Sequence, residues 1–289
     1  MERPIASVLI PTHNPGGWIG NVLDRVFEQQ VDFRFEVIIV DSSSRASDVE
    51  LIRNYPVEFH QIPAADFGHG RTRNFLGALA RGRLLLYLSQ DAEPADTTWM
   101  RNLVEPLEDP AVAGCYARQI PRCDADPLIR FFLARTYPAQ PAQRGIANRG
   151  SARIDEIFFS NVSSAIRRDA WERFPFRDDI IMSEDQYWAH DVLHAGHRVV
   201  YHPAARVFHS HNYSLPMLFR RNWQSGASLR GLIADPPAAI ARRGLRYVVD
   251  QAGYLVSGGR AHWLPYMLLY ETTKAIGFGM GMRFGQQHT

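Results

Sequence analysis

The chain has 289 residues, 46% of them hydrophobic and 21% charged, and a formal net charge of only +2. Such a composition is typical of a globular protein, so disordered and fibrous classes are excluded, and the weak charge argues against a nucleic-acid-binding protein. Cys115 and Cys123 are too few for a disulfide framework and suit a reducing compartment. With neither a secretory signal nor an apolar run of spanning length, we expect a cytoplasmic location.

Strands and helices alternate through the first hundred residues. Short apolar runs that end in polar turn residues predict strands at 6–10, 35–40, 58–62 and 84–88. Apolar residues at helical spacing and turn signals predict the intervening helices at 18–30, 46–54 and 71–80. This alternation is typical of βαβ units around a parallel sheet, so residues 1–110 are predicted to form a nucleotide-binding half.

Polar residues follow three of these strands. They are Pro11 to Asn14, Asp41 to Ser43, and Ser89 to Asp91. Because open α/β sheets bind ligands at the carboxyl ends of their strands, we expect these residues to share a site. Neither a dinucleotide-binding glycine motif nor a P-loop is present. Each polar residue alone could be a helix cap, but together with His69, Arg71 and Arg73 they favour a nucleotide diphosphate and a divalent metal.

The second half, residues 111–214, is less regular. Strands are predicted at 112–119, 158–167, 198–203 and 206–209, and a helix at 127–136 that buries Phe131 and Phe132. The segment 136–153 reads as a long loop of the kind that forms lids. Glu184 and Asp185 begin a helix, where acids ordinarily complement the helix dipole. His209 and His211 alternate with Ser210, so on a strand they would share one face.

Residues 7–214 resemble the inverting, nucleotide-sugar-dependent glycosyltransferases of family 2, which have the GT-A fold. The matching motifs are P-T-x-N at residues 11–14, the aspartate at 41, H-G-x-T-R-N at 69–74 and E-D-x-x-W at 184–188. The family's D-x-D signature differs here, because Ser89 replaces its first aspartate and only Asp91 remains. Within the family, residues 67–74, 89–92 and 207–214 are similar to bacterial rhamnosyltransferases that use dTDP-L-rhamnose.

This resemblance implies an inverting, metal-dependent transfer of L-rhamnose from dTDP-L-rhamnose in cell-surface polysaccharide biosynthesis. The acceptor would be a glycan or a polyprenyl-diphosphate-linked saccharide. A transferase that uses a UDP-hexose is one alternative, and a non-catalytic nucleotide-sugar- or glycan-binding protein is another.

The resemblance also assigns the site residues. The nucleotide-sugar ligands would be Pro11, Thr12, Asn14, Asp41, His69, Gly70, Arg73, Asn74 and Gln90. Asp185 would be the catalytic base, and Asn161, Glu184 and Trp188 would bind the acceptor. Asp91, His209 and His211 would hold Mg²⁺ or Mn²⁺, although one of these histidines could be purely structural. A divalent ion suits a departing diphosphate, and inversion needs a single base.

The C-terminal stretch, residues 215–289, is rich in arginine and in aromatic residues and methionine. Positive charges outnumber negative ones here: Asp235 and Asp250 stand against arginines at 220, 221, 230, 242, 243, 246 and 260. Basic helices of this kind can lie on a membrane, here the inner face of the plasma membrane. Alternatively, the stretch packs on the catalytic domain or forms a homodimer. The fold prediction is an α/β GT-A protein, with a Rossmann-like, mostly parallel sheet flanked by helices in 1–214 and a helical appendage in 215–289.

Overall fold

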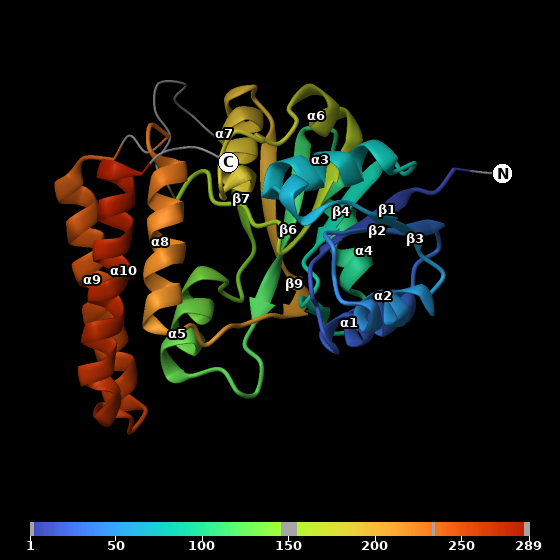
Figure 1. Ribbon diagram of the computed structural model, residues 1–289. Coiled ribbons are helices and arrows are strands. Elements are labelled where there is room, and N and C mark those ends of the chain that lie inside the picture. The colour runs from blue at the N-terminus through green and yellow to red at the C-terminus, as the bar shows by residue number, and fades with distance from the viewer. Residues whose placement is uncertain (1–2, 146–154, 233–234, 286–289) are drawn as a thin grey trace.

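The computed structural model describes residues 3–145, 155–232 and 235–285 (Figure 1). Its strands are β1 (Ala6–Thr12), β2 (Phe35–Asp41), β3 (Glu58–Gln61), β4 (Leu84–Leu88), β5 (Glu93–Pro94), β6 (Val112–Ile120), β7 (Ala142–Arg144), β8 (Ser163–Arg167) and β9 (Arg198–Phe208). Its α-helices are α1 (Trp18–Phe27), α2 (Ala46–Arg53), α3 (His69–Leu79), α4 (Trp99–Val104), α5 (Pro127–Thr136), α6 (Arg168–Arg173), α7 (Glu184–His194), α8 (Leu215–Leu229), α9 (Pro237–Ser257) and α10 (Leu264–Phe284).

The strands form one mixed sheet in the order β3-β2-β1-β4-β8-β6-β9-β5, with β7 paired to β9. β1 runs parallel to β2 and β4, β2 to β3, and β6 to β9. β8 is antiparallel to both β4 and β6, so β6 has the direction of β4. The predicted α/β class with a mostly parallel sheet is therefore confirmed.

Helices cover both faces of the sheet (Figure 1). In β4, Leu84, Leu86 and Leu88 pack on the layer of α1, α2 and α4, whereas Leu85 and Tyr87 pack on the layer of α3, α5 and α7. Successive side chains of a strand point to opposite faces, so a strand covered on both sides needs an unbroken apolar run. This explains the sequence L-L-L-Y-L, which leads directly to the polar edge at Asp91.

Several predictions from the sequence were wrong. The strand predicted at 158–167 is limited to β8, residues 163–167. Residues 198–208 form one strand instead of two, because the pairing with β6 continues past Pro203 through a register shift between Ala117 and Arg118. Phe132 is 39% exposed, whereas Phe131 is buried, since neighbouring residues on a helix point in different directions. Of the predicted loop 136–153, residues 142–144 form β7, and 146–153 lie outside the described residues.

The predicted C-terminal helical appendage is present, with α8, α9 and α10 side by side at one end of the molecule (Figure 1). Glycines let α8 and α10 approach closely: a Cβ atom on Gly281 would lie 2.1 Å from the carbonyl oxygen of Trp223, and one on Gly226 would lie 2.3 Å from that of Phe278. Helix α9 packs instead on α5, where Phe131 meets the ring of Tyr247. None of the described helices has the length and apolarity needed to cross a bilayer.

The packing of α8 on α10 can be tested with two glycines of α10. Gly281→Ala should lower the free energy of unfolding by about 1–3 kcal/mol, because the new methyl group meets backbone. Gly279→Ala is the matched control: nothing lies within 4 Å of its Cβ position, so alanine should stabilise the helix by up to about 1 kcal/mol. Urea denaturation measures both changes. Equal stability of the two variants would contradict this packing.

Candidate active site

An open cavity of about 660 Å³ lies at the carboxyl ends of β1 and β4 and extends to α8 and α10. The residues that line it and that the sequence had assigned to the site are Pro11, Thr12, His69, Arg73, Gln90, Asp91, Glu184, Asp185, His209 and His211. These residues come from five separate segments of the chain. The fold thus brings together donor-side, metal and catalytic candidates in one cavity.

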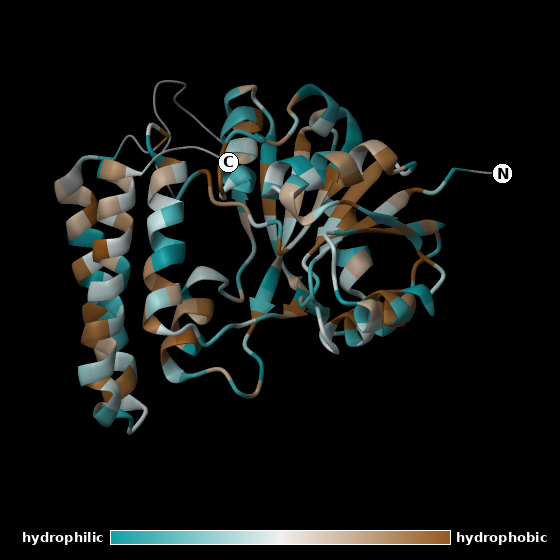
Figure 2. Ribbon diagram, viewed as in Figure 1, coloured by the Kyte–Doolittle hydropathy of each residue, from teal (hydrophilic) through white to brown (hydrophobic). Residues whose placement is uncertain are grey.

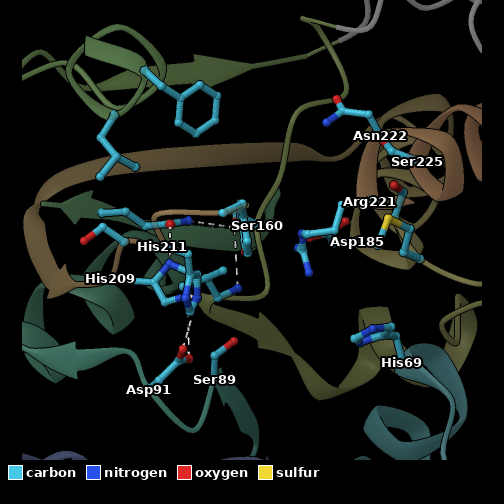
Figure 3. Close-up of a pocket in the computed structure, with 18 of the residues that line it drawn as sticks. His69, Ser89, Asp91, Ser160, Asp185, His209, His211, Arg221, Asn222 and Ser225 are labelled. Atoms are coloured by element: carbon cyan, nitrogen blue, oxygen red, sulfur yellow. Dashed lines mark hydrogen bonds and ion pairs between the residues drawn. The ribbon is translucent and has the colours of Figure 1, made fainter. Parts of the chain in front are cut away.

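Asp91, His209 and His211 meet on one side of this cavity (Figure 3). The Nε2 atom of His211 lies 3.1 Å from Oδ2 of Asp91, and Nε2 of His209 lies 3.6 Å from Oδ1. The two Nε2 atoms are 3.1 Å apart. Two imidazole nitrogens this close need either the N–H hydrogen of one ring or a metal ion between them, because two facing lone pairs would repel. One carboxylate and two imidazoles form a donor set suited to Mn²⁺ or another divalent ion.

A second layer of side chains orients His209. Its Nδ1 atom lies 2.8 Å from Oε1 of Gln119, an acceptor, so Nδ1 carries the hydrogen and Nε2 is left with its lone pair toward Asp91. Gln119 in turn donates to the hydroxyl oxygen of Ser160 at 3.1 Å. Burial lowers the pKa of His209 to about 4, which keeps this ring neutral at physiological pH. A neutral, oriented imidazole is the form that binds metal.

Asp91 is held in its ionised form. Burial alone would raise its pKa, but the hydrogen bond from His211 and the charges that His209 and His211 carry in the acidic range where Asp91 titrates outweigh burial and lower the pKa to about 2. Arg122 also donates to the backbone oxygen of Asp91, and its guanidinium lies 3.6 Å from the ring centroid of Trp18. These contacts fix the turn after β4. The residues present therefore fit the predicted metal.

Asp185 and Glu184 begin α7 on another side of the cavity. The preceding residue, Ser183, has a left-handed backbone with φ of 68°. Oδ2 of Asp185 accepts from the backbone N–H of Asn161 at 3.1 Å, and Oδ1 accepts from that of Gln186 at 2.9 Å. Two backbone donors thus fix the orientation of the Asp185 carboxylate.

The two neighbouring acids titrate very differently. Burial and then the charge of Glu184 raise the pKa of Asp185 to about 7. Burial would raise the pKa of Glu184 as well, but Arg73, whose Nη1 lies 2.9 Å from Oε1, and His69 reverse that effect and lower it. A pair of carboxyl groups whose environments push their pKa values apart is typical of acid–base catalysis. Asp185 is the member that can exchange a proton near neutral pH.

Asp41 and Asn14 do not line the cavity. Their side chains accept hydrogen bonds that connect the loops at its edge. The buried carboxylate of Asp41 accepts hydrogen bonds from Thr12 Oγ1 and the backbone N–H of Ser44, both at 2.9 Å. The side-chain oxygen of Asn14 accepts from the backbone N–H of Arg45 at 3.1 Å. These bonds join the loop after β1 to the loop after β2.

Four further predicted site residues are also absent from the cavity lining. They are Gly70, Asn74, Asn161 and Trp188. Gly70 allows close backbone contact, since a Cβ atom there would lie 1.8 Å from the carbonyl oxygen of Arg177. Asn74 binds both the carbonyl and the N–H of Phe176, at 2.7 and 3.0 Å. Asn161 donates to the carboxylates of Asp185 and Glu184, so it supports two residues that do line the cavity.

Several cavity residues were missed from the sequence. On α8 they are Arg221, Asn222 and Ser225, and on α10 they are Tyr270 and Lys274. Figure 3 shows the α8 residues across the cavity from Asp91. The guanidinium of Arg221 lies 4.9 Å from the ring centroid of Tyr213. Arg221 had been counted with the membrane-facing arginines, so the structure corrects its placement. The i, i+1, i+4 spacing of three polar residues on α8 was the available signal.

The comparisons with known proteins agree with this geometry. The sequence profile described as glycosyl transferase family 2 matches residues 7–174. The O-antigen chain rhamnosyltransferase RfbN of Salmonella typhimurium is 31% identical over 280 residues, which is 95% of this chain and 88% of that protein. WbaN of Salmonella anatum, also an O-antigen chain rhamnosyltransferase, is 28% identical over 285 residues, which is 96% of this chain and 89% of that protein.

Solved structures are similar in fold at lower identity. The mannosyltransferase PcManGT from Pyrobaculum calidifontis, in complex with GDP-Man and Mn²⁺, has a TM-score of 0.65 and 20% identity, covering 96% of this chain and 88% of its own. TarS 1-349 of S. aureus in complex with UDP has a TM-score of 0.57 and 13% identity, with 96% and 90% covered. The fold is thus that of the GT-A glycosyltransferases. From its profile match, its relatives and its fold, this chain belongs to glycosyl transferase family 2 and is a glycosyltransferase.

Proposed function

We propose that this enzyme transfers L-rhamnose from dTDP-L-rhamnose to a glycan acceptor, with inversion, in cell-surface polysaccharide biosynthesis. The observation that carries the reaction type is one proton-exchanging carboxylate, Asp185, in the same cavity as the cluster of Asp91, His209 and His211. The two rhamnosyltransferase relatives, aligned over nearly the whole chain, support the choice of sugar.

In this proposal the donor lies along the sheet edge, and Asp91, His209 and His211 would hold Mn²⁺ or Mg²⁺. The ion, when bound, neutralises the negative charge of the leaving dTDP. Asp185 removes the proton of the acceptor hydroxyl while that oxygen bonds to the anomeric carbon. The bond from this carbon to the diphosphate oxygen breaks at the same time. Arg221 adds positive charge to the same cavity.

The metal assignment can be tested by Mn²⁺ binding in the presence of dTDP, followed by electron paramagnetic resonance. Gln119→Leu should weaken Mn²⁺ binding about 10- to 100-fold, the usual effect of losing an outer partner of a histidine ligand, and Asp91→Asn should weaken it further. Asp169→Asn, at an exposed carboxylate paired with Arg167, is the control and should bind normally. Normal Mn²⁺ affinity in Asp91→Asn would exclude this site.

The catalytic role of Asp185 is tested by Asp185→Asn, which keeps the shape but removes the base. Transfer from dTDP-L-rhamnose should fall by roughly 10²–10⁴-fold while donor affinity holds. Asp191→Asn, an exposed acid on the same helix, is the control and should leave turnover unchanged. NMR of the product should show an inverted anomeric configuration. Full turnover in Asp185→Asn, or retention, would refute the mechanism, and preference for a UDP-hexose would refute the donor.

The pH profile follows from the raised pKa of Asp185. Only the ionised carboxylate can accept a proton, so kcat/KM should fall as the pH drops below about 7. In Glu184→Gln the negative neighbour is lost and Arg73 is left unpaired, and both changes favour ionisation of Asp185. The fall of kcat/KM should therefore occur at lower pH in this variant. Glu172→Gln, at an exposed glutamate, is the control and should leave the pH of this fall unchanged. An unchanged pH profile in Glu184→Gln would contradict this assignment.

We also propose that the outer face of α9 and α10 contacts the inner face of the plasma membrane. Figure 2 shows hydrophobic residues along these helices at the edge of the molecule. The exposed apolar side chains are Leu245, Val249, Val256, Leu268, Leu269, Ile276, Met280 and Phe284. Arg242, Arg246 and Arg283 are exposed on the same helices, whereas Asp250 is paired with Arg135. An apolar face with exposed arginines suits anionic lipid.

Co-sedimentation with phosphatidylglycerol vesicles tests this contact. The protein should bind the vesicles. Binding should weaken in 1 M salt, which screens the electrostatic attraction. It should also weaken in the double variant Val249→Asp/Leu268→Asp, which adds negative charge and removes apolar area. Phe75→Asp, at an exposed residue of α3, is the control and should leave vesicle binding unchanged. If the double variant instead only abolished a dimer in sedimentation velocity, the face would bind a second copy.

A further inference from the structure

The end of the cavity farthest from the sheet has a different character from the rest. Its lining from α5 is Leu128, Ile129, Phe132 and Leu133, and its lining from α9 and α10 is Tyr247, Tyr270 and Lys274. The mechanism above uses none of these residues. Phe132, the residue wrongly predicted to be in the core, is 39% exposed here. A large exposed ring in a cavity wall offers a stacking surface to a ligand.

Lys274 is the one lysine of the chain, and it is already engaged. Its Nζ atom lies 2.9 Å from Oε2 of Glu271 and within 5.0, 5.7 and 5.9 Å of the ring centroids of Tyr247, Tyr270 and Phe132. The ammonium charge is therefore neutralised by the carboxylate and shared among three rings. It fixes the aromatic rings in place and leaves no net positive charge for a phosphate.

Polar atoms around this aromatic group lack partners. The Tyr247 hydroxyl and Oε1 of Glu271 are buried without a hydrogen bond among the described residues. Gln251, one turn along α9 from Tyr247, is wholly buried, and neither its amide oxygen nor its amide nitrogen has a partner there. Of these residues only Tyr247 lines the cavity. Buried polar groups are costly when unpaired, so its hydroxyl is the group here that a polar ligand in the cavity would complete.

These observations select one chemical class of ligand. A pyranose ring has an apolar C–H face that stacks on aromatic rings and a rim of hydroxyl groups that donate and accept hydrogen bonds. A diphosphate would meet aromatic rings and the Lys274–Glu271 pair, which has no net charge, so this end of the cavity offers it no charged partner. A neutral sugar matches both the rings and the unpaired Tyr247 hydroxyl.

We propose that this end of the cavity is the acceptor subsite, and that it holds a neutral pyranose unit of the acceptor glycan. The ring stacks on Phe132 or Tyr247, and one of its hydroxyls bonds to the Tyr247 hydroxyl. The assignment rests on the proposed glycosyl transfer, since Asp185 lines the same cavity. Any lipid diphosphate of the acceptor lies outside this subsite.

Saturation-transfer NMR tests the proposal, with dTDP and Mn²⁺ saturating the donor side. The probes are the methyl α- and β-pyranosides of glucose, galactose, mannose and rhamnose, together with inorganic pyrophosphate. At least one glycoside should bind, about 3- to 10-fold more weakly in Tyr247→Phe and about 10-fold more weakly in Phe132→Ala, the usual effect of one hydrogen bond or one stacked ring. Tyr266→Phe and Phe284→Ala, exposed and outside the cavity lining, are the matched controls and should bind normally.

Two results would overturn the proposal. One is that no glycoside binds, or that binding is equal in all four variants. The other is that pyrophosphate binds and Lys274→Met abolishes it, which would make this an anion site. Affinity for dTDP-L-rhamnose should stay unchanged in Tyr247→Phe and Phe132→Ala, which also shows that both variants fold. If the glycosides bind but dTDP-L-rhamnose does not, the donor assignment fails and the acceptor subsite stands.

Discussion

A buried ion pair between Arg73 of α3 and Glu184 of α7 is the contact on which the active site depends. Both side chains are at least nine-tenths buried, and their charged atoms are 2.9 Å apart. Taking two charges out of water is costly, so such a pair adds little to stability compared with apolar packing. Its effect here is electrostatic and geometric. It keeps Glu184 ionised beside Asp185, and it ties the donor-side helix to the helix that carries the proposed base.

Backbone strain is found at the same edge of the sheet. Among the described residues, the non-glycine positions with positive φ are Asn14, Ser43 and Ser183. The first two follow β1 and β2, and their loops are joined by hydrogen bonds to Asp41 and Asn14. The third precedes Glu184 directly. Strained backbone persists only where surrounding contacts hold it. Of the three residues, Ser183 lines the cavity, and its strain directly before Glu184 and Asp185 is a physical mark of a functional site.

The C-terminal helices are a wall of the site as well as an appendage. Close packing at Gly226, Gly277 and Gly281 brings α10 against α8. That approach places Tyr270 and Lys274 in the cavity with Arg221, opposite Asp91 and its histidines. The three C-terminal helices therefore connect three features. These are the polar cavity wall on α8, the aromatic end that we assign to the acceptor, and the exposed apolar face on α9 and α10.

The sequence by itself determined the strand order along the chain, the buried run of β4 and the polar residues at its end. Such features depend on local periodicity, which a single segment carries. It also identified Asp91, His209 and His211 as a group, through motif order and not through any local signal. The surroundings of each side chain, in contrast, depend on the tertiary structure. A polar or aromatic residue on a helix, such as Arg221 or Phe132, has the same pattern whether it faces solvent, a membrane or a cavity. The pKa of Asp185 likewise depends on burial and on Glu184, which only the packed fold provides.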